Sequence, residues 1–255
     1  MNKVIAGIVT LSLSSFALIS VAAADEITAL FPGSLKHANA QLISQFERSS
    51  GNKVNAVYST AGAVANKVRN GEAADVAVSG AGAMDQLTKQ GKLLSGSTTA
   101  IIKVGAGALV RKGAAKPDIS TVENLKAALL AAKAISYTDP ALGGPVGIYI
   151  GKLMDKLGIG PQMKLKTKLS GPGAAVSTTV VNGEADIGFI MINEILEDAR
   201  VDYAGPLPQP VQYYTTFAGG IVAASKHQVT ARAFISFLSS SASRGFLEKL
   251  GFEAP

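Results

Sequence analysis

The sequence predicts an α/β protein of two lobes, each built on a doubly wound sheet and joined to the other by a two-segment hinge. Short β-rich runs alternate with longer helical patterns, and this alternation is typical of parallel strands connected by helices. One helix-to-strand segment occurs twice along the chain. Two further β-rich runs are long enough to pass from one sheet to another. Together these features predict two similar lobes with a cleft between them.

The first 24 residues have the pattern of a secretion signal. Lys3 gives a positive start, residues 4–21 are almost wholly apolar, and residues 22–24 place alanines where a signal peptidase cuts. The alternative is a membrane anchor, which needs about 20 strongly apolar residues and no cleavage site. We expect residues 1–24 to be removed and the mature chain to begin at Asp25 in the periplasm, without insertion into the membrane.

The composition describes a chain that folds on its hydrophobic core alone. About 230 residues follow the signal, 47% of the full chain is hydrophobic, and no cysteine is present for disulfides. A chain of this size buries about 70% of its unfolded surface. The net charge of +6 is not gathered into a basic run and Trp is absent, so we expect no nucleic-acid partner. The charge is either a solvated basic face or a mild attraction for small anions.

The expected strands and helices follow one another in a regular order. Helical spacing places Leu35, Leu42 and Phe46 on one face, and Gly91 is a stop signal. The expected strands are residues 26–31, 52–58, 76–78, 134–137, 164–169 and 187–191, and the expected helices are residues 34–49, 62–70, 84–90, 147–157 and 174–182. A closing helical segment spans residues 232–252.

A short segment is repeated within the chain. Residues 67–76 resemble residues 180–187, and in each copy a helix end is followed by Gly, an acidic turn and a buried strand. The two copies lie about 112 residues apart. They are either two ordinary helix-to-strand turns or equivalent parts of two lobes with the same topology.

Two β-rich runs, residues 101–112 and 211–222, are the expected crossings between the lobes. This gives a first lobe from residues 25–104 and 213–255, and a second lobe from residues 105–212. We expect the mature protein to be a monomer.

Four expected helices begin in small or hydroxylated residues directly after a strand. These starts are residues 31–34, 58–62, 139–147 and 170–174. Ligands bind beyond the carboxyl ends of strands in open parallel sheets. A helix start offers unpaired N–H groups and about half a positive charge, so four starts facing one cleft would hold an anion. Taken singly, each is an ordinary helix cap.

The sequence contains few residues that match known catalytic or metal-binding motifs. His37 and His227 are the only histidines, too few for a typical zinc site, and no phosphate-loop, nucleophile-elbow or dinucleotide motif is present. We therefore expect no metal and no cofactor. Lys36 and His37 lie in the first turn after Ser34, next to the expected ligand. Such a histidine is either a solvated surface residue or an acid–base group.

The chain resembles the periplasmic molybdate-binding proteins of ABC transporters, which have the two-lobed type II solute-binding fold. The matching pieces are Gly33-Ser34-Leu35, residues 61–64, residues 70–76, Thr138-Asp139-Pro140, residues 145–149, residues 183–188 and Gly251-Phe252. They span the mature chain, and each alone is a weak signal. The resemblance implies that an oxyanion binds between the lobes.

The ligand positions depart from the family pattern in two places. The family holds its oxyanion with a serine after the first strand, which Ser34 matches. A second serine is replaced here by Ala61, and a tyrosine is replaced by Met191. A buried dianion needs a full set of donors. The loss of two hydroxyls and the added Gly143-Gly144 pair therefore favour a larger, flatter anion, such as a di- or tricarboxylate.

The resemblance leaves two functions open. One is a binding protein that delivers a small anion to an ABC transporter permease. The other is an isomerase, because the periplasmic aconitate isomerases are similar to molybdate-binding proteins and interconvert trans- and cis-aconitate. That reaction needs holders for the carboxylates and a proton carrier, for which Lys36, His37 and Tyr149 are the candidates. The expected ligand contacts are Ser34, Thr60, Ala61, Gly62, Gly144, Val146, Gly173 and Met191.

Overall fold

A computed structural model describes residues 24–255. The expected secretion signal, residues 1–24, lies outside the described residues apart from Ala24, so it stays a prediction. No helix within residues 24–255 combines the length and the apolar character needed to cross a bilayer.

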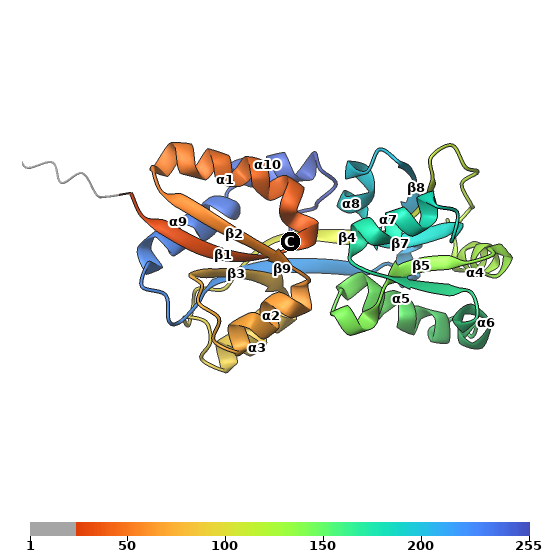
Figure 1. Ribbon diagram of the computed structural model, residues 1–255, viewed down its shortest axis with the longest axis horizontal. Helices are drawn as coiled ribbons and strands as arrows, with labels where there is room; N and C mark the ends of the chain where they lie inside the picture. Colours follow the sequence, from red (N-terminus) through yellow and green to blue (C-terminus); the bar gives the residue numbers. More distant parts are fainter. Residues whose placement is uncertain (1–23) are drawn as a thin grey trace, which may run out of the picture.

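Two sheets share one long strand, β4 (Thr99–Arg111) (Figure 1). The first sheet has the order β2-β1-β3-β9-β4, and the second has the order β4-β7-β5-β6, with β8 also paired to β4. The other strands are β1 (Glu26–Pro32), β2 (Lys53–Ser59), β3 (Val76–Gly80), β5 (Ile135–Thr138), β6 (Thr167–Ser170), β7 (Ile187–Met191), β8 (Val201–Pro206) and β9 (Tyr214–Ile221). The two lobes are thus joined by β4 and by the segment between β8 and β9, which confirms the two-segment hinge.

The two lobes repeat one topology. In each lobe three parallel strands have the order second, first, third, and an antiparallel strand follows the third: β9 in the first lobe and β4 in the second. The repeated segment plays the same part in both. The Asp75 N–H donates to the Thr28 carbonyl at 2.8 Å, and the Asp186 N–H donates to the Ala134 carbonyl at 2.9 Å. The repeat therefore marks equivalent helix-to-strand turns of two similar lobes.

Helices cover both faces of the first sheet (Figure 1). Strand β1 turns Ile27, Ala29 and Phe31 toward one cluster of buried side chains and Leu30 toward another, because successive residues of a strand face opposite ways. The first cluster includes residues of α1 and α9, and the second includes residues of α2 and α3. The helices of this lobe are α1 (Lys36–Ser50), α2 (Ala61–Arg69), α3 (Ala81–Lys89), α9 (Gln228–Leu238) and α10 (Ser241–Glu248).

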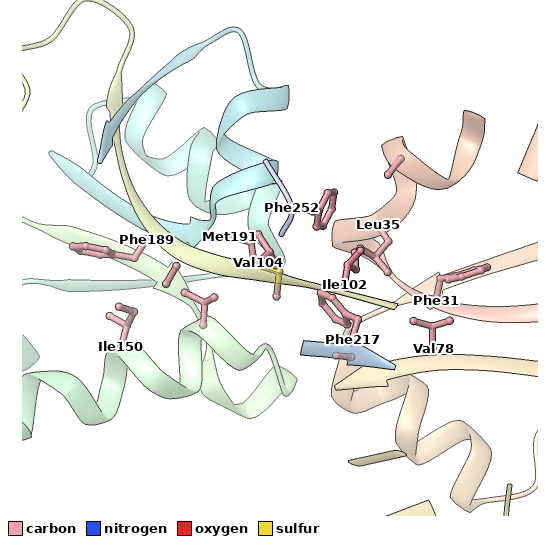
Figure 2. Packing of buried hydrophobic residues seen from close by; sticks show 14 of the residues in the cluster. Phe31, Leu35, Val78, Ile102, Val104, Ile150, Phe189, Met191, Phe217 and Phe252 are labelled. Atoms are coloured by element: carbon pink, nitrogen blue, oxygen red, sulfur yellow. The ribbon is translucent and has the colours of Figure 1, made fainter. Parts of the chain in front are cut away.

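The second sheet is covered in the same manner (Figure 1). Its helices are α4 (Val122–Ala131), α5 (Pro145–Lys156), α6 (Gly160–Lys164), α7 (Gly173–Val181) and α8 (Ile192–Glu197). Buried apolar side chains continue from one lobe to the other along β4, where Ile102 and Val104 lie near Met191 and Phe252 (Figure 2). The two lobes therefore share one packed core along β4.

Several elements differ from the sequence prediction. The strand expected at 164–169 is shorter, because α6 occupies the residues up to Lys164 and only Thr167–Ser170 pairs with β5. The closing helical segment is two helices, because the Ser240 hydroxyl accepts the Ser243 N–H and starts a new helix. The helix expected at 34–49 begins with a 3-10 turn, Gly33–Leu35. Helices α4 and α8 and strand β8 were not expected: α8 and β8 are short, and the helical spacing of Val122, Leu125 and Leu129 in α4 was overlooked.

Candidate functional site

A cavity of about 190 Å³ lies between the lobes. Its volume is below the range of pockets for drug-sized ligands, which begins at about 300 Å³, so it suits a small molecule. The first lobe contributes Pro32, Gly33, Ser34, Ser59, Thr60 and Ala61, and the second contributes Thr138, Gly144, Pro145, Val146, Gly147, Pro172, Gly173, Ala174, Ile190, Met191 and Glu194. We call this cavity the cleft.

The wall of the cleft gathers the starts of four helical segments. Gly33 and Ser34 belong to the first 3-10 turn, and Ala61 begins α2. Gly144 precedes α5, and Gly173 begins α7. The residues before α5 and α7 make no side-chain cap, and first-turn residues of both helices line the cleft. Helix starts favour an anion.

The two lobes touch at both rims of the cleft. The Gly62 N–H donates to the Gly143 carbonyl at 3.3 Å, and a Cβ on Gly62 would lie 3.0 Å from the Gly143 Cα. The Asn193 side-chain amide donates to the Ser34 carbonyl at 2.8 Å. Gly62 thus lies at the rim, outside the residues that line the cleft. These contacts describe a closed arrangement in which backbones of both lobes meet.

No Lys, Arg or His lines the cleft, and Glu194 is the one ionisable carboxyl among its described lining residues. Burial and, to a smaller extent, the nearby Glu197 carboxylate raise the pKa of the Glu194 carboxyl to about 7, while the Met191 N–H bonds to the carboxyl and opposes the shift. Desolvation and like charge both disfavour a carboxylate. At neutral pH the Glu194 side chain is therefore divided between its ionised and neutral forms.

Glu194 reaches the cleft because Gly173 leaves room for it. A Cβ on Gly173 would collide with the Glu194 carboxyl. Glu194 lies on the short helix α8, directly after the carboxyl end of β7. Sequence reasoning missed it. The available signal was a lone acidic residue in the apolar run of residues 187–196, placed just after a buried strand.

A second cavity, the outer cavity, adjoins the cleft and shares Glu194 and Ser34 with it. Lys36 and His37 line this outer cavity and not the cleft, and both are exposed. Its remaining lining residues are Gly33, Ala40, Ala174, Ser177, Glu197 and Asp198. Burial raises the pKa of the Glu197 carboxyl, and the charge of His37 opposes this.

Tyr149 lies away from both cavities. Its hydroxyl donates to the Val211 carbonyl at 2.8 Å, and its ring stacks on Tyr213 with 4.6 Å between ring centroids. Burial raises the pKa of its hydroxyl. The side chain packs α5 against the second crossing between the lobes, so it supports the hinge.

The other expected ligand contacts meet in one place. Ser34, Thr60, Ala61, Gly144, Val146, Gly173 and Met191 all line the cleft. The Thr60 hydroxyl also accepts the Ala63 N–H at 3.1 Å, which caps α2. Ser59 and Thr138 add hydroxyls that sequence reasoning did not assign to the ligand. No group of three or more potential metal ligands occurs within residues 24–255.

Comparisons with known proteins agree with this architecture. The chain is 26% identical over 249 residues to an aconitate isomerase of Pseudomonas sp., covering 95% of this chain and 93% of that one. It is 22% identical over 218 residues to a molybdate-binding protein of Azotobacter vinelandii, covering 83% of each. The solved structure of the Azotobacter vinelandii periplasmic molybdate-binding protein superposes with a TM-score of 0.75 at 19% identity, covering 90% of this chain and 99% of that one.

The family model described as bacterial extracellular solute-binding protein matches residues 27–253. This match covers both lobes and both hinge crossings, and the neighbouring structures have the type II periplasmic binding fold. The chain therefore belongs to the bacterial extracellular solute-binding protein family.

Proposed function

We propose that this protein binds a small unsaturated tricarboxylate in the cleft and interconverts trans- and cis-aconitate there. The observation that carries the proposal is the composition of the cleft wall. Helix starts and hydroxyls from both lobes surround a small cavity that contains no fixed cation among its described residues. The relative from Pseudomonas supports the choice of aconitate, since its similarity extends over nearly the whole of both chains.

The wall suits a carboxylate better than a compact tetrahedral oxyanion. Ala61 and Met191 offer no hydroxyl, and Val146 and Ile190 add apolar surface. An inorganic dianion enclosed by such a wall would lack donors for part of its surface, and unsatisfied buried charge is costly. A tricarboxylate places its charges at the ends of a carbon skeleton. The helix starts can hold those ends while the apolar residues contact the carbons between them.

Isomerisation of aconitate moves one proton along an allylic system. A C–H bond breaks at the methylene carbon, its electron pair is delocalised toward the neighbouring carboxylate, and a C–H bond forms at the carbon that was vinylic. The double bond shifts by one position, so the two isomers have the same atoms and charge. The reaction needs held carboxylates and one group that takes and returns a proton.

Isomerisation is tested by incubating purified protein with trans-aconitate and following both isomers by proton NMR. The expected result is conversion to a fixed isomer ratio that is also reached from cis-aconitate, because a catalyst speeds both directions equally. Heat-denatured protein is the control. An unchanged isomer ratio at high protein concentration, with binding of aconitate demonstrated by calorimetry, would refute the isomerisation and leave binding.

Binding without turnover is the second candidate function, and the closed rims of the cleft favour it. Contacts such as that between Gly62 and Gly143 enclose the ligand space in the manner of a receptor that closes on its solute. In this case the protein would deliver the anion to an ABC transporter permease in the periplasm, as a monomer. Binding of molybdate with no binding of carboxylates would contradict both candidates.

Ser34 provides a test of the site itself. Ser34 lines the cleft at the first helical turn, where its hydroxyl and the N–H groups of that turn face the ligand space. Ser34→Ala should weaken binding by about 1.5–3 kcal/mol, as expected for a hydrogen bond to a charged group. Titration calorimetry with trans-aconitate measures the change. Ser49→Ala is the control, because the Ser49 hydroxyl donates to the Phe46 carbonyl at the far end of α1; equal losses in the two variants would refute the contact.

A further inference from the structure

We propose that Glu194 is the group in the cleft that takes a proton from the ligand and returns it, an assignment that rests on the proposed isomerisation. Glu194 is the one ionisable side chain that lines both the cleft and the outer cavity. It therefore faces the ligand on one side and a solvent-connected space on the other. Glu194 lies outside the sequence motifs that carry the family resemblance.

The other candidate carriers are less well placed. Lys36 and His37 line the outer cavity only, on the exposed side of α1. The Tyr149 hydroxyl is held by the Val211 carbonyl at the hinge. A proton carrier must come within hydrogen-bond reach of the reacting carbon or of one water next to it. Of these side chains, Glu194 alone forms part of the cleft wall.

The step is balanced with Glu194 as a single acid–base group. The ionised Glu194 carboxylate takes the proton from the methylene carbon, and the electron pair of that C–H bond enters the allylic system of the ligand. The neutral Glu194 then donates the proton to the carbon that was vinylic. Glu194 is restored to its ionised form, and no other reactant is consumed. The first-turn N–H groups of α5 and α7 hold the ligand carboxylates, which gain charge while the allylic anion exists.

The charges around Glu194 suit a proton carrier at neutral pH. On the outer side lie Glu197 on the same helix, Asp198 just after it, and Lys36 and His37 on α1. On the cleft side no charged side chain faces it among the described lining residues. A bound tricarboxylate brings further negative charge to this side, which increases the neutral fraction of Glu194. Binding should therefore take up a fraction of a proton at a pH where free Glu194 is ionised, and the molecules that keep an ionised Glu194 are the ones that take the ligand proton.

Two measurements on the full protein test the assignment. In the first, turnover of trans-aconitate is measured for Glu194→Gln, which keeps the shape of the side chain and removes its acid–base function. The expected loss is about 10²–10⁴-fold, the usual contribution of general acid–base catalysis. Glu194→Asp should recover part of the rate, because it restores a carboxyl. Glu197→Gln is the matched control on the same helix and should keep turnover within a few-fold, with its pH midpoint lowered by the loss of a like charge.

In the second measurement, proton uptake on binding of trans-aconitate is determined by calorimetry in buffers of different ionisation enthalpy. At about pH 8 the wild-type protein and Glu197→Gln should take up a measurable fraction of a proton, while Glu194→Gln should take up none. Binding with an uptake that vanishes only in Glu194→Gln, but without turnover in the wild type, would refute the isomerisation and support Glu194 as the proton-binding group. Turnover that survives in Glu194→Gln, or proton uptake that is unchanged in it, would overturn the assignment.

Discussion

Gly147→Ala is expected to destabilise the protein by about 3 kcal/mol, at the upper end of the usual cost of overpacking. A Cβ on Gly147 would lie 2.0 Å from the Thr138 carbonyl oxygen, and no rotation of a side chain can relieve a contact with backbone. Helix α5 would have to move away from the end of β5. Because the same turn carries Gly144 and Val146 into the cleft, ligand affinity should fall together with stability.

The control is Gly151→Ala, one helical turn later in α5. A Cβ there would lie 3.7 Å from Pro140 and Tyr137 side-chain atoms, an ordinary contact distance. Alanine is favoured over glycine inside a helix by up to about 1 kcal/mol, so this variant should be slightly more stable than the wild type. Urea denaturation of the two variants measures the difference. A Gly147→Ala variant as stable as Gly151→Ala would contradict the close packing of α5 on β5.

Glu194→Gln is expected to remove a pH dependence of stability worth about 3 kcal/mol in the wild-type protein. The Glu194 pKa is about 7 in the folded chain, raised by burial and by Glu197, against an ordinary value of 4.5. Between these two pH values the folded state binds more protons than the unfolded state. The contribution of Glu194 to stability is therefore present below about pH 4.5 and is lost as the pH rises through about 7.

The measurement is urea denaturation from about pH 4.5 to about pH 8 for both proteins. The stability of Glu194→Gln relative to the wild type should increase across this window, because glutamine carries no charge to desolvate. Glu123→Gln, an exposed position on α4, controls for the loss of one acidic residue. A constant difference between Glu194→Gln and the wild type would mean that the Glu194 carboxyl is well solvated in the folded protein.

Much of the fold could be predicted from local sequence. Apolar spacing along residues 35–46 indicated α1, and the repeated turns at Gly71 and Gly183 indicated two lobes of one topology. Both signals are local, because they depend on the period of a helix and on the positive φ that glycine adopts readily at 80° and 77°. The extents of the lobes, 25–104 with 213–255 and 105–212, remain a prediction. Among the elements that were missed, α8 and β8 are short, while α4 has apolar residues at helical spacing that were overlooked.

Only part of the candidate site could be predicted from local sequence. The helix starts at Ser34, Thr60, Gly144 and Gly173 could be anticipated, because parallel strands end at one edge of a sheet and ligands bind there. The place of Glu194 in the cleft could not be anticipated. The residues next to it in the sequence do not show that Gly173 leaves space for its carboxyl or that Glu197 lies near it.

The sequence by itself thus determined the α/β class, the two similar lobes and the helix starts that face the cleft, because each depends on residues close together in the chain. The tertiary structure alone decided which ionisable group lines the cleft. It placed Lys36 and His37 on the outer side, bound the Tyr149 hydroxyl at the hinge, and placed the partly buried Glu194 between two cavities. The protonation of a carboxyl depends on desolvation and on charges near it in space, and these arise only when the chain is folded.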